Sequence, residues 1–592
     1  DELDKRIADS YVAKSTATNN NSLYDSYVRA FRWASDRLNN TGGGIIGFVS
    51  NAGWLESNSA DGMRKCIAEE FSSIYVYHLK GNQRTSGERS RQEGGKIFDS
   101  GSRAPIAITI LGKNPNAAER GRIYFHAVDD YLTRQEKLDE VRRSGSITNI
   151  EWQTITPNIH GDWFNLRDSS FNQFMTVYSK DNDVNMFSIA SFGVQTSRDA
   201  WAYNSSIETV TNNMRRSVDV YNENLLRAET IDNYAIELDP KIIKWDREQV
   251  KRLKRGVKSD PFSREKIVES IYRPFFKQRL FFDKAWNHMT FQLFKLFVNG
   301  ECNNPVILIS GKGARTFSCH MSNIVPCYDC LEKTFCLPRY LYIRNDIFGF
   351  AGSGLQPFGQ GVFDDDGIKP NNSGLERIDA ISDNALRHFS EAYGKEITAD
   401  DLFYYIYGIL HSEDYRTRYA NNLMKELPRI PRVATYEQFM AFRDAGRALG
   451  ELHVNYENVP PYDGVTITGE ESENYRVVQM KYGKIPGKTG NAAKDKTRLV
   501  YNEDITITNI PIAAQDYIVN KKSALDWVVE RACIKTDKET GIVNDFNQWG
   551  IEHDNPRYPL ELFLKVITVS LETMKIVRAL PPLDIHPLDR EG

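Results

Sequence analysis

The sequence lacks any apolar run close to the roughly 20 residues that a membrane-spanning helix requires, so we expect no membrane partner. Cysteine is scarce, with seven in 592 residues, which excludes a disulfide-stapled fold and predicts a reducing, cytoplasmic location. The formal net charge is only −4, so the surface as a whole is not that of a general polyanion binder. Binding to a polyanion would therefore depend on a local basic patch.

The chain also lacks a nucleotide-binding motif and the usual features of a protein N-terminus. It contains no G-x-x-x-x-G-K-[ST] phosphate loop. Its first residues, Asp1-Glu2-Leu3, include neither an initiator Met nor a signal-peptide layout, so we expect a fragment of something longer. What is present is ordinary for a globular protein. Apolar residues make up 41% and charged residues 26%, and the length predicts several domains.

The first 113 residues alternate between helix-like and strand-like segments. Apolar side chains recur at helical spacing in 22–38 and 60–71, and apolar runs predict strands at 45–49, 74–79 and 105–111. The alternation predicts an α/β sheet. Because the last two strands have only a polar loop between them, we expect them to form an antiparallel pair.

The remainder has a less regular pattern. We expect a helix at 131–143, then short strands and loops with occasional helices to about 380, with a linker at 371–374. The later expectations are a mainly helical segment at 382–455, a strand-rich segment at 463–512, and helical segments at 522–534 and 557–579.

Several stretches match motifs of one enzyme family. They are SLYD (22–25), GGGIIGFVSNAGWL (42–55), HLKGNQRTSGERSRQEGGKIF (78–98), PIAITIL (105–111), FGVQTSRDAWAYN (192–204), YRPFFKQRLFFD (272–283), FYYIYGILHSEDYRTRYANNLMKELPRIP (403–431) and TGIVNDFNQW (540–549). The N-terminal matches resemble the post-catalytic half of γ-class DNA adenine-N6 methyltransferases. Together, the matches resemble type ISP restriction–modification enzymes, single chains that combine nuclease, translocase, methyltransferase and target recognition.

This resemblance implies an α/β fold in three parts. A partial Rossmann-like methyltransferase sheet would occupy 1–130, and a mixed α/β target-recognition region would follow, divided into 131–380 and 381–592. The implied function is sequence-specific recognition of double-stranded DNA and adenine-N6 methylation with S-adenosylmethionine. The implied partners are DNA and the upstream nuclease, translocase and methyltransferase segments of the same polypeptide.

The chain departs from the family in its catalytic motifs. Family members bind S-adenosylmethionine at a Gly-containing loop and catalyse with Asn-Pro-Pro-Tyr, and both motifs would precede 22–38. Neither is present, and Val459-Pro460-Pro461-Tyr462 lacks the required Asn. We therefore expect no catalytic residue, no bound cofactor and no methyl transfer by this chain alone. The alternative is a non-catalytic specificity protein that acts with a separate methyltransferase chain.

The segment 80–98 carries the first candidate site residues. Phe98 stands where γ-class enzymes present an aromatic ring to a flipped base, and a core Phe at a strand start is the alternative. The loop before it is rich in cations that would either hold phosphates or form a solvated surface. These cations are Lys80, Arg84, Arg89, Arg91 and Lys96.

Three further segments are candidate DNA contacts. In the segment 192–199 the side chains of Gln195, Thr196 and Arg198 are suited to base edges or phosphates, and a tight polar turn is the alternative. A second basic group lies around Gly-rich turns and consists of Lys481, Lys484, Lys488, Lys494, Lys496 and Arg498. A third, at 241–255, falls on an amphipathic helix, where a solubilising face is an equal alternative.

Two other patterns favour structure over chemistry. Cys327 and Cys330 have zinc-knuckle spacing but no regular second pair, so we expect buried free thiols and no metal. His411 beside Ser412 invites a catalytic interpretation. The tyrosines around it favour helix packing, with Ser412 or Asp414 as a helix N-cap.

Overall fold

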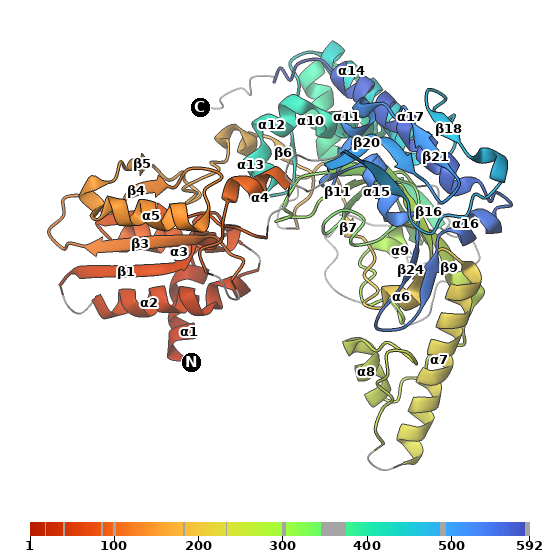
Figure 1. The fold of residues 1–592 in the computed structure, drawn as a ribbon, viewed down its shortest axis with the longest axis horizontal. Coiled ribbons are helices and arrows are strands. Elements are labelled where there is room, and N and C mark those ends of the chain that lie inside the picture. The colour runs from red at the N-terminus through yellow and green to blue at the C-terminus, as the bar shows by residue number, and fades with distance from the viewer. Residues whose placement is uncertain are drawn as a thin grey trace, which may run out of the picture. The chain divides into compact units, whose positions relative to one another are not determined.

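A computed structural model describes residues 1–17, 19–38, 42–84, 87–98, 102–180, 184–231, 234–298, 304–344, 375–485 and 493–585. They divide into two compact units, 1–168 and 169–592 (Figure 1). The linker expected at 371–374 lies outside the described residues, as does Lys488. No helix in the described ranges is long and apolar enough to cross a membrane.

Unit 1 contains one five-stranded sheet with the strand order β1-β3-β2-β4-β5. Its strands are β1 (Gly44–Asn51), β2 (Ser73–His78), β3 (Ile106–Lys113), β4 (Arg122–Ala127) and β5 (Gln153–Ile155). Its helices are α1 (Glu2–Ile7), α2 (Ser26–Leu38), α3 (Asp61–Glu70), α4 (Gly87–Glu93) and α5 (Arg134–Ser144). Strands β2 and β4 are parallel, and the other neighbours are antiparallel. The antiparallel pairing expected between 74–79 and 105–111 is confirmed.

Alternating side chains of this sheet enter two separate hydrophobic cores. Ile74 and Val76 of β2 pack with side chains of α2 and α3, whereas Tyr77 enters a smaller core with Leu138 and Val141 of α5. The strand periodicity of two thus places helices on both faces of the sheet. The smaller core also contains Ile97, so α5 lies beside the segment that joins β2 to β3.

Unit 1 extends past the boundary expected at residue 130. Strand β5 pairs with β4, and the Trp163 ring lies 5.3 Å from that of Trp54. The buried Arg64 guanidinium donates to the Gly161 carbonyl at 2.8 Å. These long-range contacts join residues 150–168 to the sheet. The sequence did not predict this, because residues 150–168 form only one short strand and loops.

Unit 2 is mixed α/β, with many short strands, and the predicted fold class is confirmed. Its helices are α6 (Asp199–Ala202), α7 (Ile207–Thr230), α8 (Arg247–Lys254), α9 (Leu293–Leu296), α10 (Asp383–Tyr393), α11 (Ala399–His411), α12 (Glu413–Arg418), α13 (Ala420–Leu423), α14 (Tyr436–Val454), α15 (Ala524–Arg531), α16 (Asn547–Glu552) and α17 (Tyr558–Arg578).

The strands of unit 2 form small sheets with orders β13-β9-β10-β8, β12-β11-β14-β7 and β18-β21-β20-β19, and several two-stranded ladders. They are β6 (Met175–Thr176), β7 (Ser191–Phe192), β8 (Tyr203–Asn204), β9 (Ile267–Arg273), β10 (Phe276–Phe281), β11 (Val306–Ile309), β12 (Cys319–Ser322), β13 (Val325–Pro326), β14 (Phe335–Pro338), β15 (Tyr340–Arg344), β16 (Leu375–Asp379), β17 (Arg429–Ile430), β18 (Thr466–Thr468), β19 (Lys481–Ile485), β20 (Ala493–Val500), β21 (Thr506–Thr508), β22 (Ile518–Val519), β23 (Lys522–Ser523), β24 (Ile534–Thr536) and β25 (Val543–Asp545).

One hydrophobic core runs through unit 2 from Phe171 to Val577, so the described residues show no separate cores on either side of 380. Helices α11 and α14 approach closely within this core. A Cβ at Gly408 would lie 2.1 Å from the Phe442 carbonyl oxygen, and one at Gly446 would lie 1.9 Å from that of Tyr404. Glycine at both positions therefore permits the two backbones to touch.

Candidate nucleic-acid interface

The segment between β2 and β3 is held in place by hydrogen bonds. The Gln83 side-chain amide donates to the Gly94 carbonyl, and Gly95 N–H donates to the Leu132 carbonyl, both at 2.9 Å. Gly94 has φ +66°, and a Cβ there would lie 2.2 Å from the Leu132 oxygen. The segment includes helix α4, where the sequence predicted a plain loop. The prediction missed the helix because the local sequence is polar and gives no sign of these tertiary contacts.

A buried lysine supports this segment from α5. The Lys137 ammonium donates to the carbonyls of Glu93 at 2.6 Å and Gly95 at 2.8 Å, and the residue has no exposed surface. Burial lowers the pKa of Lys137 to about 8. Sequence reasoning missed Lys137 because α5 is strongly polar. A usable signal is its position on the same helical face as Leu138 and Val141.

Phe98 follows this segment with an exposed ring. Its side chain is 47% exposed, whereas the neighbouring Ile97 is buried and its carbonyl accepts from Arg134 Nε at 2.8 Å. Ile97 therefore has the core role that the alternative gave to Phe98. An exposed aromatic ring beside a fixed segment suits base stacking, and that role remains a prediction.

The cations of this segment differ in their surroundings. Lys80 is mostly buried and pairs with Asp130 at 2.6 Å, so its charge already has a partner within the protein. Asp130 is about half exposed, so contact of Lys80 with DNA phosphates remains a prediction. Arg84 and Arg91 are exposed, and Lys96 is half-buried. The Arg89 side chain lies outside the described residues.

Residues 192–199 run from β7 to the start of α6 and are built into unit 2 by backbone pairing. The backbones of Gln195 and Met289 exchange two hydrogen bonds of 2.9 Å. Thr196 is buried, its hydroxyl donates to Asp199, and its oxygen accepts from Arg198 N–H at 3.1 Å. The expectation that Thr196 contacts DNA is therefore wrong, because its hydroxyl is used inside the fold. A role for the half-buried Gln195 side chain remains a prediction.

Arg198 forms a buried ion pair. Its Nη2 donates to Asp246 Oδ2 at 2.6 Å, and the two side chains are 1% and 5% exposed. Its guanidinium carbon lies 5.3 Å from the centre of the Trp286 ring. Burial lowers the pKa of Arg198 to about 10. The expectation that Arg198 reaches DNA is wrong, because the side chain points into the protein and is paired there.

The β19–β20 hairpin carries the second basic group. Lys481 and Lys484 are exposed on β19, and Lys484 lies directly opposite the exposed Lys494 of β20. Like charges at facing positions destabilise a strand pair, and a bound anion would remove that repulsion. Lys496 instead pairs with Asp526 at 2.8 Å. Phosphate contact by Lys481 and Lys484 therefore remains a prediction with a physical basis.

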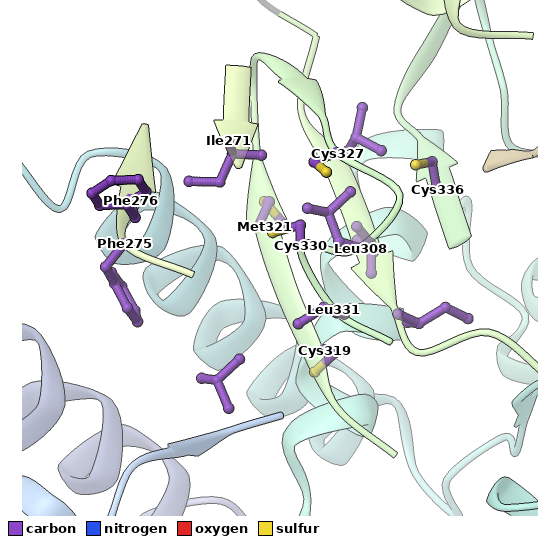
Figure 2. Packing of buried hydrophobic residues seen from close by; sticks show 14 of the residues in the cluster. Ile271, Phe275, Phe276, Leu308, Cys319, Met321, Cys327, Cys330, Leu331 and Cys336 are labelled. Carbon is purple, nitrogen blue, oxygen red and sulfur yellow. The ribbon is translucent and has the colours of Figure 1, made fainter. Parts of the chain in front are cut away.

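Cys327 and Cys330, which have zinc-knuckle spacing in the sequence, lie in the core of unit 2 with two further cysteines (Figure 2). Arg273 Nη1 donates to Cys327 Sγ at 3.5 Å, and burial raises the pKa of Cys327 to about 11. The expected buried free thiols are confirmed at Cys327 and Cys330, and Cys319 and Cys336 are also buried and free. Among the described residues, no three His, Cys, Asp or Glu side chains are grouped so that they could hold a metal ion.

His411 is likewise a core residue. Its Nδ1 lies 3.0 Å from the Tyr407 carbonyl, and burial lowers its pKa to about 3, so the ring is neutral. The Tyr407 hydroxyl lies 2.6 Å from His453 Nδ1. The Ser412 hydroxyl accepts from Tyr415 N–H at 3.2 Å and caps α12. The packing interpretation of 403–431 is confirmed.

Comparison with known proteins assigns the family. A search of curated proteins gave no match, but the model of the type ISP C-terminal specificity domain matches residues 185–562. A nuclease-deletion mutant of the type ISP enzyme LlaGI, solved with a DNA substrate mimic, is 37% identical, with a TM-score of 0.80. The type ISP enzyme LlaBIII bound to DNA is 33% identical (TM-score 0.82), and a DrdV–DNA complex is 31% identical (TM-score 0.78).

Each alignment covers 99% of this chain, but only 43%, 36% and 55% of LlaGI, LlaBIII and DrdV respectively. The chain thus spans about two fifths of the first two relatives. Since the domain model matches more than half of the chain and these relatives align with nearly all of it, the chain belongs to the type ISP restriction–modification family.

Proposed function

We propose that this chain selects a specific sequence in duplex DNA as part of a type ISP restriction–modification enzyme. The observation that carries the proposal is that LlaGI, LlaBIII and DrdV, each solved with DNA or a DNA mimic, align with almost the whole chain. The exposed lysines of the β19–β20 hairpin supply the local basic surface that a net-acidic chain needs.

Unit 1 has the features expected for the second half of an adenine-N6 methyltransferase sheet. Strand β3 is antiparallel and lies between β1 and β2, and β1 is at the sheet edge within the described residues. Ile45 and Val49 of β1 are 76% and 58% exposed, which is unusual for β-branched side chains on an edge strand. In the proposal, upstream strands of the same polypeptide pair with β1 and cover these side chains.

The contribution of this chain to methylation would be to hold the target base. Family members use S-adenosylmethionine as the methyl donor, but the chain has neither the glycine loop nor the Asn-Pro-Pro-Tyr motif that would serve it, so its residues do not fit that cofactor. What it has is Phe98, whose exposed ring can stack on an extruded adenine. Lys137 fixes the segment that precedes this ring through the Glu93 and Gly95 carbonyls.

DNA recognition is tested by selection from random sequence. The 592-residue chain is incubated with a pool of 40-base-pair duplexes that carry a randomised centre, and bound duplexes are amplified and sequenced over several rounds. A single enriched motif is the expected result. Enrichment of no motif, with the chain folded and binding the pool, would overturn the proposal.

The methyltransferase assignment is tested by transfer of a tritiated methyl group to the selected duplex. The chain alone is expected to be inactive, and a chain extended upstream through an Asn-Pro-Pro-Tyr motif is expected to be active. Activity of the chain alone would refute the assignment. So would inactivity of the extended chain when it still binds the selected motif.

A further inference from the structure

Helix α8 and its flanks form the most basic surface segment of this net-acidic chain. Residues 241–258 contain eight Lys or Arg side chains against two acids, a local excess of six positive charges. One of the acids, Asp246, is buried in the pair with Arg198. Local charge of this density attracts polyanions regardless of the sign of the whole protein.

The cations of α8 share one face of the helix. Arg247, Lys251 and Lys254 are spaced i, i+4 and i+7, and all three are exposed. The opposite face, with Gln249 and Leu253, is buried against the protein. Three cations in a row therefore point to solvent from a surface of defined geometry.

The helix dipole favours Lys251 and Lys254, which lie in the last turn, so helix stability accounts for these two cations but not for Arg247. Arg247 is at the first helical position, where the helix dipole disfavours positive charge. The like-charged i, i+4 neighbours Arg247 and Lys251 repel each other. Glu248 pairs with Lys251 at 2.6 Å, but both side chains are half exposed, so the pair contributes little. Among the described residues, neither Arg247 nor Lys254 forms an ion pair with a carboxylate, which favours an external anion as their partner.

The helix is fixed to the body of unit 2 from several directions. Asp246 caps α8 by accepting from Gln249 N–H at 2.9 Å, and the same carboxylate holds Arg198. After the helix, the Val257 carbonyl accepts from the Tyr221 hydroxyl of α7 at 2.7 Å. Figure 1 shows α8 beside α7. The cationic face is thus presented with little conformational freedom to lose on binding.

We propose that the α8 face of Arg247, Lys251 and Lys254 binds the phosphate backbone of duplex DNA independently of its sequence. The inference rests on the proposed function and assigns a second contact apart from the β19–β20 hairpin. It gives the segment 192–199 a supporting role, since Arg198 holds the residue that caps α8. A phosphate contact contributes affinity for every sequence alike, in contrast to a base contact.

The test measures how salt weakens binding of the full chain to a random-sequence 40-base-pair duplex. Each phosphate contact adds about 0.9 to the slope of log affinity against log salt. The triple variant Arg247→Gln, Lys251→Gln and Lys254→Gln should lower the slope by about two to three and the affinity at 0.1 M salt by at least about tenfold. A variant with Lys251→Arg and Lys254→Arg keeps the charge and should retain the wild-type slope.

A matched control removes three other exposed cations of unit 2, by Arg387→Gln, Lys395→Gln and Lys575→Gln. It should keep the wild-type slope. The proposal is overturned if the two triple variants behave alike, if the α8 variant keeps the wild-type slope, or if it weakens only a selected motif. If selection yields no motif but the α8 variant still lowers the slope of log affinity against log salt, the proposed function fails and phosphate binding by α8 is retained.

Discussion

Replacement of Arg198 by Met should destabilise unit 2 by about 3–5 kcal/mol, because it leaves the Asp246 carboxylate buried without its cation. The pair is closed at 2.6 Å with both side chains almost fully buried, so solvent screening does not soften the loss. Contact of the guanidinium with Trp286 is lost as well, although Met partly refills that space. Removing an exposed DNA-contacting arginine would change stability by no more than about 0.5 kcal/mol.

A second substitution separates the charge from the rest of the site. Asp246→Asn in the Arg198→Met background removes the stranded charge and keeps a side-chain oxygen to cap α8, a contact worth about 1 kcal/mol. The double variant should therefore recover most of the lost stability, since a buried ion pair replaced by neutral groups is often close to neutral.

The assay is urea unfolding followed by tryptophan fluorescence, with the salt dependence of DNA binding measured in parallel. Arg198→Met should lower the unfolding midpoint, and the double variant should recover it. Unchanged stability of Arg198→Met together with a salt slope lower by about one would refute the buried ion pair, because that combination marks an exposed phosphate contact.

Three further predictions concern Lys137, three buried histidines and Phe98. The folded chain releases the Lys137 proton near pH 8, whereas the unfolded chain holds it to about pH 10.5, so the free energy of unfolding should rise with pH between these values. The stability advantage of wild type over Lys137→Met should therefore widen from pH 7.5 to 9.5, and a constant difference would contradict this. Burial lowers the pKa of His320 to about 4, of His411 to about 3 and of His453 well below 6.5. The free energy of unfolding should therefore fall as the pH drops from 6.5 toward 4, by up to about 1.4 kcal/mol per pH unit for each ring. A free energy of unfolding that does not change over this pH range in urea unfolding would count against neutral buried rings. Phe98→Ala in the upstream-extended chain should remove about 1–3 kcal/mol of base stacking and lower methyl transfer more than DNA binding. Equal losses with a lower melting temperature would show that the ring supports the fold instead of a flipped base.

The sequence predicted the elements whose signals are local. Strands 45–49, 74–79 and 105–111 are short β-branched runs, and the helices of 403–431 have apolar residues at regular spacing, so each appears near its expected place. Long-range partners were not accessible in this way. Lys137 was not recognised as buried because its acceptors, Glu93 and Gly95, lie more than 40 residues earlier in the chain.

The same limit explains the errors in the candidate site. Arg198 and Thr196 have the chemistry of DNA contacts, but Asp246 and Asp199 hold them inside the fold. Lys80 also has a partner far along the chain, Asp130, but this pair is partly exposed. Composition shows which side chains are able to bind phosphate, whereas tertiary pairing decides which of them are already occupied.

Sequence-specific DNA recognition by this chain can be measured as a ratio of two dissociation constants. One is measured for the duplex enriched by selection and the other for a duplex of the same length and base composition with the motif shuffled, both at 0.15 M salt. The selected duplex should bind at least about 1,000-fold more tightly, and single base-pair changes within the motif should each weaken binding by about 1–3 kcal/mol. Equal dissociation constants for the two duplexes would contradict sequence-specific recognition.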